Sequence, residues 1–129
     1  MLNIVVHFKN RAMLKGTTAN FFPQRPSFHL VTSAGVATEV QISELKAIFF
    51  VKSLAGDPSH KESQDFPQQG GAGMGRKARV VCNDGEVLAG FCPSYRKDLK
   101  GFFLFPADKN SNNERIFVVA DSVKNVEMS

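Results

Sequence analysis

Short runs in which apolar and polar residues alternate fill most of this chain. In residues 3–9, Ile4, Val6 and Phe8 alternate with Asn3, His7 and Lys9, which is typical of a strand with one buried face. Similar runs, separated by turn residues, recur along the sequence and predict an all-β fold. The predicted strands are 3–9, 12–22, 27–32, 37–42, 46–51, 78–83, 86–95, 101–105, 115–120 and 124–128, with one-turn elements at 43–45 and 121–122.

The pattern of the first five strands is repeated in the last five. A shift of 74 positions places Val6 on Val80 and Gly16 on Gly90, and a shift of 78 places Val40 on Val118. Such a repeat indicates two copies of one structural unit. We expect a first repeat at 1–52, a flexible Gly-, Pro- and Gln-containing linker at 53–75 and a second repeat at 76–129. Whether the repeats form two barrels or one fused barrel is left open.

Glycines mark the turns and bends of the predicted strands. Asp84-Gly85 lies between two strands and predicts a two-residue type I′ hairpin, and Asn10-Arg11 holds the same position in the first repeat. Gly16 and Gly90 interrupt the second strand of each repeat, where a glycine is typical of a bulge or sharp bend.

Composition narrows the class of protein. Twelve phenylalanines with one tyrosine and no tryptophan predict a core built mainly of Phe, and the net charge of +4 permits an anionic partner without requiring one. Cys82 and Cys92 make neither a disulfide framework nor a metal site, so we expect reduced thiols. With no signal segment and no apolar run of about 18 residues, we expect a cytoplasmic protein without membrane contact.

The five-strand plan of each repeat resembles the small SH3-like and Sm-like barrels. Residues 80–90, Val-Val-Cys-Asn-Asp-Gly-Glu-Val-Leu-Ala-Gly, are similar to the first half of the first Sm motif, and Val6–Gly16 fits the same pattern. The resemblance implies two SH3/Sm-like barrels packed as a pseudo-dimer. The Asp and Asn with which Sm proteins hold RNA bases have no counterpart here, so RNA-binding residues are not carried over.

Most of the chain outside the linker also resembles uncharacterised bacterial proteins of the delta-proteobacterial type, small all-β proteins of unknown function. The shared runs lie at Val6–Thr18, Phe21–Pro23, Gly101–Asp108, Ser111–Arg115 and Val123–Val126. This resemblance implies no activity.

Catalytic chemistry finds little support in the sequence. His7 and His29 fall on the outward phase of their strands with no third ligand beside them, so we interpret both as surface residues. Cys82 falls on the inward phase, and the second repeat contains no histidine to activate a thiol. We therefore expect no enzyme activity, no metal and no cofactor.

Two groups of polar residues are candidate partner-binding sites. One is a basic group around a predicted hairpin tip, and the other is a polar loop on which exposed amides could hold a ligand. Pure turn chemistry explains that loop equally well. The candidates are Arg25, Tyr95, Arg96, Lys97, Asn110, Asn112, Asn113 and Arg115.

Each repeat also carries apolar residues on its outward phase that the other lacks. Contiguous exposed apolar side chains are typical of interfaces. We predict an interface between the repeats, or between two chains, made by Phe49, Val51, Phe103 and Phe105.

These observations favour a non-catalytic binding or adaptor module whose partner is a protein or peptide, because open strand edges can accept an extended segment. Single-stranded nucleic-acid binding by an Sm-like barrel is the first alternative, with Tyr95 beside Arg96-Lys97 as the stacking candidate. A sensor of cyclic dinucleotides or another small ligand, using Arg76, is the second. A homo-oligomer is also left open.

Overall fold

The protein is described by a computed structural model that covers residues 2–56, 75–93, 95, 100–108 and 110–128. The predicted all-β class is confirmed: ten strands form one open antiparallel sheet, and the described residues contain no helix besides two 3₁₀ turns. The first half comprises β1 (Leu2–Phe8), β2 (Met13–Thr18), β3 (Ser27–Val31), β4 (Ala37–Gln41), η1 (Ile42–Glu44) and β5 (Leu45–Val51). The second comprises β6 (Arg76–Cys82), β7 (Val87–Cys92), β8 (Gly101–Pro106), β9 (Asn113–Val119), η2 (Ala120–Ser122) and β10 (Val123–Met128).

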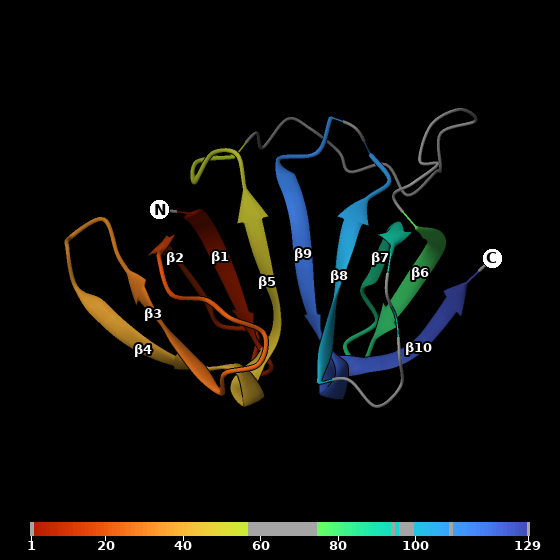
Figure 1. Cartoon of the computed structure of the whole chain (residues 1–129), viewed down its shortest axis with the longest axis horizontal. Coiled ribbons are helices and arrows are strands. Elements are labelled where there is room, and N and C mark those ends of the chain that lie inside the picture. The colour runs from red at the N-terminus through yellow and green to blue at the C-terminus, as the bar shows by residue number, and fades with distance from the viewer. Residues whose placement is uncertain (1, 57–74, 94, 96–99, 109, 129) are drawn as a thin grey trace.

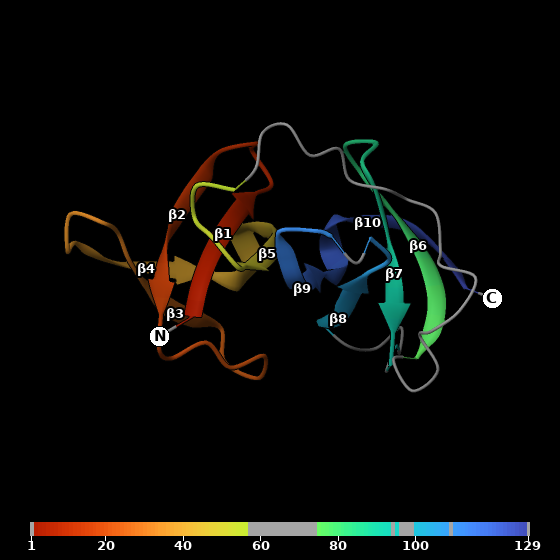
Figure 2. The ribbon, with the colours of Figure 1, turned by 90° about the horizontal axis from the view of Figure 1, so that it is seen from above.

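The order of strands across the sheet is β10-β6-β7-β8-β9-β5-β1-β2-β3-β4. In each half the last strand therefore lies beside the first: β5 lies beside β1, and β10 lies beside β6. The strands β5 and β9 join the two halves at the centre of the sheet (Figure 1). Figure 2 shows the two halves curling away from this central pair. The outermost strands are β4 at one end and β10 at the other, so both keep one edge that no described strand covers.

Strand pairing follows the same register in both halves. Ile48 lies opposite Val6 in the first half, and Val126 lies opposite Val80 in the second. Likewise, Thr17 lies opposite Val31 as Phe91 lies opposite Phe105. These pairs correspond under the shifts of 74 and 78 that the sequence shows. Side chains at corresponding positions therefore occupy comparable places in the two halves.

The second strand of each half is shorter than predicted. In the first half β2 ends at Thr18. Beyond it, the side-chain oxygen of Asn20 accepts a hydrogen bond from the backbone N–H of His29 at 2.9 Å, in place of a backbone carbonyl of a longer β2. In the second half β7 ends at Cys92, and the next residue, Pro93, has no N–H to extend the ladder.

The predicted type I′ turn at Asp84-Gly85 is wrong. Gly85 has a φ of 94°, but Asp84 is not among the residues with positive φ. Hydrogen bonds from Gly85 N–H to Cys82 O and from Cys82 N–H to Glu86 O close a three-residue loop. This is the form in which a type I turn is followed by a left-handed residue. Arg11, with a φ of 75°, takes the left-handed place in the loop after β1.

Close approach between neighbouring strands explains the glycines in β2 and β7. A Cβ built on Gly16 would collide with the carbonyl of Val31, and one on Gly90 would collide with the carbonyl of Phe105. Gly16 therefore lets β3 lie close to β2, and Gly90 lets β8 lie close to β7. This close approach bends the sheet around its buried side chains.

Two hydrophobic cores lie in the curled sheet, and each draws side chains from both halves. The first core is built mainly by the first half but includes Phe117 and Val119 of β9. The second core is built mainly by the second half but includes Phe49 and Val51 of β5. Successive residues of β5 and β9 face opposite cores, since neighbours on a strand point to opposite faces. Separating the halves would therefore expose both cores.

Candidate functional site

The central strands β5 and β9 bring the two halves into contact along most of their length. Their register places Ala47 opposite Val118, Ile48 opposite Phe117 and Phe49 opposite Ile116. All of these side chains are buried. At roughly 1.5–3 kcal/mol for each large apolar side chain, this burial fixes how the halves sit against each other.

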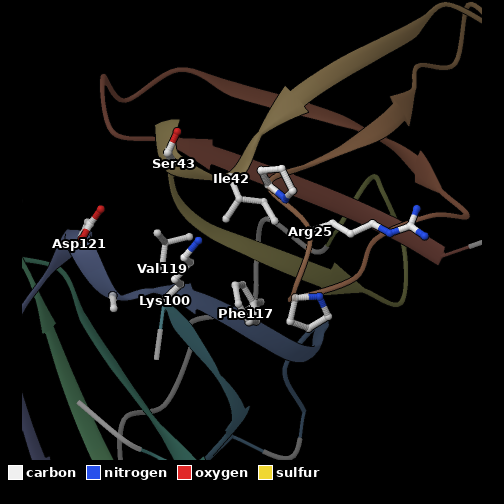
Figure 3. A pocket seen from close by; sticks show the side chains of 10 residues that line it. Arg25, Ile42, Ser43, Lys100, Phe117, Val119 and Asp121 are labelled. Carbon is white, nitrogen blue, oxygen red and sulfur yellow. The ribbon is translucent and has the colours of Figure 1, made fainter. Parts of the chain in front are cut away.

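A cleft opens beside this junction, between the loop preceding β3 and η1 on one side and β9 with η2 on the other. Its volume is about 570 Å³, within the range of ligand-binding sites. Figure 3 shows Ile42 and Ser43 on the wall formed by the first half, facing Lys100, Val119 and Asp121 on the other. The lining residues are Pro23, Arg25, Pro26, Ile42, Ser43, Lys100, Phe117, Val119, Ala120 and Asp121.

The floor of the cleft is apolar and its rim is charged. Ile42, Phe117 and Val119 are buried at 7%, 3% and 3% exposure, so the floor is a rigid part of the first core. Lys100 is exposed and its side chain points between the walls in Figure 3. Among the described residues no carboxylate lies within ion-pair distance of Lys100, whereas Asp121 lies 3.7 Å from the ammonium of Lys9.

Arg25 lies at the far end of the same cleft. Its guanidinium is 4.9 Å from the ring centre of Phe22, a cation–π contact, and in Figure 3 it points away from Lys100. Phe22 is 47% exposed, more than the other phenylalanines that the structure describes. The cleft therefore offers an apolar floor, one cation at its centre and a second cation on an aromatic ring at its end.

A buried ion cluster links the halves on another surface. Lys46 of β5, only 8% exposed, donates hydrogen bonds to Asp84 Oδ2 at 2.7 Å and to Glu86 Oε1 in the turn after β6. Burial alone would lower the pKa of Lys46, but these hydrogen bonds outweigh it and the pKa lies above its usual value. The hydrogen bond from Lys46 holds the pKa of Asp84 below its usual value. Lys46 and Asp84 therefore stay charged at neutral pH, and the hydrogen bonds of Lys46 orient the β6–β7 turn.

His7 is not the surface residue that the sequence predicted. Its side chain is half-buried, and its ring centre lies 4.4 Å from that of Phe49 on the neighbouring strand β5. Burial lowers the pKa of His7, with Lys46 acting in the same direction against the carboxylates of Glu86 and Asp84. His29 is exposed and its Nδ1 lies 3.0 Å from Asn20 Nδ2.

The two thiols lie in the second core. Cys82 is 1% exposed and Cys92 is 2% exposed. Burial raises the pKa of Cys82 to about 11, so its thiol stays protonated at neutral pH. In the described part of the chain, no cluster of three His, Cys, Asp or Glu residues could hold a metal ion. No helix of the described residues is long and apolar enough to cross a membrane.

The structure does not gather the predicted partner-binding residues into one site. Arg25 lines the cleft, whereas Tyr95 lies on another face with its ring 5.0 Å from that of Phe102. Arg96 and Lys97 lie outside the described residues, as do residues 57–74 of the predicted linker. Lys100, the last residue of the predicted basic hairpin tip, completes the cleft together with Ile42 and Phe117, which sequence reasoning did not select.

The polar loop before β9 is bound to the protein by its own side chains. The amide of Asn112 accepts the N–H of Ser53 at 3.1 Å and donates to its carbonyl at 2.9 Å. The N–H of Asn110 is bound by Asp108, and Asn113 lies opposite Val51 in the sheet. These contacts fix the end of β5 to the start of β9.

The residues predicted to lie between the repeats occupy different places. Phe49 and Val51 are buried in the second core. Phe103 packs against the first core, 5.2 Å from the ring of Phe117, with the guanidinium of Arg115 lying 5.0 Å from its ring centre. Phe105 is half-buried and lies opposite Phe91 of β7.

Comparison with known proteins places the chain in one family. A model of a family of unknown function, DUF6982, matches residues 2–129. The chain belongs to this family. No curated protein and no solved structure gives a significant match to the sequence or the fold. The description of the family carries no activity, so the proposals below depend on the geometry of the chain itself.

Proposed function

We propose that the chain is a non-catalytic binding module and that the junction cleft holds a short peptide segment of a protein partner. The observation that carries this proposal is the apolar floor of Ile42, Phe117 and Val119 with Lys100 above it. An apolar side chain on this floor and a carboxylate on Lys100 satisfy both parts of the site. The matching ligand is a peptide with an acidic residue next to an apolar one.

The position of the cleft supports this proposal. Both halves contribute to its walls, and both walls are fixed by the β5–β9 pairing and by the buried floor. A preformed site loses little conformational entropy when a ligand binds. The described residues offer no activated nucleophile: Cys82 is buried and protonated, and His7 is covered by Phe49.

The finer fold assignment is also a proposal. We infer that each half is an SH3/Sm-like barrel and that the two are related as a pseudo-dimer. The supporting observations are the shared strand order, the shared pairing registers and the 3₁₀ turn before the last strand of each half. We retain a cytoplasmic location as a proposal, supported by the two buried cysteines in a chain with no disulfide framework.

Selection of displayed random heptapeptides on the immobilised protein tests the binding proposal. We expect enrichment of sequences that join an apolar residue to Asp or Glu. The best peptide should bind Lys100→Glu at least tenfold more weakly by calorimetry, because the carboxylate would meet a like charge. Lys52→Glu makes the same charge change at an exposed position that is not part of the cleft and should bind normally. Enrichment without acidic residues, or equal loss in both variants, would contradict the proposal.

Single-stranded nucleic-acid binding has one specific observation in its favour. Phe22 is exposed beside the cleft and Arg25 stacks on it, which is the pairing of aromatic and cation that base stacking uses. Titration with a twelve-residue oligothymidylate distinguishes this alternative. Salt-dependent binding that Phe22→Ala weakens, together with failure of the peptide selection, would favour nucleic acid.

A further inference from the structure

A second surface of the protein, beside β10, carries an aromatic pair that corresponds to one at the β5–β9 junction. In the first half, Phe21 packs edge-on against Phe28 with ring centres 5.3 Å apart. In the second half, Tyr95 packs edge-on against Phe102 with ring centres 5.0 Å apart. Tyr95 follows Phe21, and Phe102 follows Phe28, by the same 74 positions. The two aromatic pairs are therefore equivalent.

The partners of these pairs differ. In the first half, Phe117 of β9 lies 5.3 Å from Phe21, because β9 pairs with β5 and covers this place. In the second half, the corresponding place is a groove of about 370 Å³ beside β10. The groove is lined by Tyr95, Phe102, Ala120, Val123, Lys124, Asn125 and Val126.

The edge of β10 matches the edge of β5 in register. Val126 lies opposite Val80 of β6, and Ile48 lies opposite Val6 of β1. Because Val80 and Val6 are equivalent, Val126 corresponds to Ile48. A strand that paired with β10 as β9 pairs with β5 would place one residue opposite Val126, and that residue would correspond to Phe117. Its side chain would enter the groove beside Tyr95.

We propose that the β10 edge binds an extended segment of a protein partner that inserts an aromatic side chain into the Tyr95 groove. Backbone hydrogen bonds along an open strand supply affinity and the pocket supplies specificity. The neighbouring residues of the segment, opposite Asn125 and Glu127, are polar, because both of these side chains are exposed. A Lys or Arg opposite Glu127 adds a cross-strand ion pair.

A second copy of this chain does not meet these requirements. Among the described strands the other open edge is β4, and the residue of β4 that corresponds to Phe117 is Glu39. A carboxylate entering an apolar groove would lose hydration without gaining a partner. The observations thus favour a separate protein partner at the β10 edge over self-association.

The strand β9 supplies the design of the probe. The peptide Asn-Glu-Arg-Lys-Phe-Thr-Val follows residues 113–119, with Lys and Thr replacing the two residues that would face solvent on β10 and with Val at the end. Acetylated, amidated and labelled with fluorescein, it is titrated with the full chain and followed by fluorescence anisotropy. The control peptide carries Glu in place of Phe.

We expect the Phe peptide to bind at least tenfold more tightly than the Glu peptide. Tyr95→Ala should weaken the Phe peptide at least tenfold, whereas Lys100→Glu in the junction cleft should leave it unchanged. When the Phe peptide is added, the amide resonances of β10 should shift in NMR spectra and those of β5 should not. Because the comparison of two peptides uses the unaltered protein, it stands even if Tyr95→Ala fails to fold.

Three results would overturn this proposal. The first is equal affinity for both peptides, and the second is absence of binding at millimolar peptide. The third is dimerisation of the chain at micromolar concentration, seen by sedimentation, with amide shifts on β4 and β10. Failure of the cleft proposal leaves these measurements unaffected, since the cleft and the β10 groove share only Ala120.

Discussion

The ammonium of Lys46 lies 2.7 Å from Asp84 Oδ2, although the two residues come from different halves of the chain. The cation is almost fully buried, whereas the side chains of Asp84 and Glu86 are 31% and 45% exposed. The two sides of this ion cluster therefore have unequal access to water. Removing the anions and removing the cation should have different consequences.

We predict that Asp84→Asn with Glu86→Gln destabilises the protein more than Lys46→Met does. The double variant leaves a buried ammonium without a counter-charge, at a cost of about 2–4 kcal/mol. Lys46→Met leaves carboxylates that water can solvate and should cost less than about 1 kcal/mol. Urea unfolding of both variants measures the difference. Equal losses would show that the cluster is no more than a surface ion pair.

His7 should make stability depend on pH. Its pKa in the folded protein lies below that in the unfolded chain, because burial against Phe49 disfavours the charged ring. The folded state therefore binds fewer protons, and the stability from this group is present above about pH 6.5 and is lost as the pH falls through the folded pKa. Chemical unfolding between about pH 7.5 and pH 5 should show this loss, and His7→Gln should remove it. An unchanged pH profile in the variant would contradict the burial of His7.

The central strands should make the two halves unfold together. Phe49→Ala removes a β5 side chain from the second core and should lower the free energy of unfolding by about 3–4 kcal/mol, still in a single transition. Phe22→Ala, a truncation of the same size at an exposed site, should cost less than about 0.5 kcal/mol. Scanning calorimetry shows whether the protein unfolds in one transition or in two. Two separate transitions in Phe49→Ala would mean that the halves fold independently.

Gly16 and Gly90 should resist substitution for a steric reason. A methyl group at Gly16 would collide with the backbone of Val31, which cannot move without breaking the sheet. We expect Gly16→Ala to cost at least about 2 kcal/mol or to prevent folding. Gly35→Ala meets no atom within 4 Å, and only its φ of 81° opposes it, so about 1 kcal/mol is expected. Thermal melts of the two variants compare these costs. Similar melting temperatures would contradict the close crossing of β2 and β3.

Local signals along the chain were enough to predict the strands, but not every turn. Alternation in Ile4, Val6 and Phe8 placed the first strand within one residue of β1, and the glycine at position 90 marked the bend of β7. The turn at Asp84-Gly85 was assigned to the wrong type. The number of residues in a hairpin loop depends on the register of the flanking strands, and a dipeptide does not show that register.

The candidate sites were much less predictable than the strands. Lys46 lies 38 residues from Asp84 and 40 from Glu86, and the cleft joins Ile42 to Lys100. These contacts depend on β5 pairing with β9, which no local pattern specifies. The charge of Arg25 is the only feature of the sequence that indicates a binding role for it. The sequence does not indicate that Phe117 lines the cleft, because the pattern of a strand does not show against which half its side chains pack. The outward phase of Phe49 and Val51 does indicate contact between the halves, because both side chains enter the second core.

The binding of an acidic peptide in the junction cleft is tested most directly by NMR. The best peptide from the heptapeptide selection is titrated into the ¹⁵N-labelled chain, and the amide shifts are mapped on the structure. We predict that the shifts gather at Ile42, Ser43, Val119 and Ala120, and that they disappear in Lys100→Glu but persist in Lys52→Glu. Shifts that avoid these four residues, or that persist unchanged in Lys100→Glu, would contradict the proposed function.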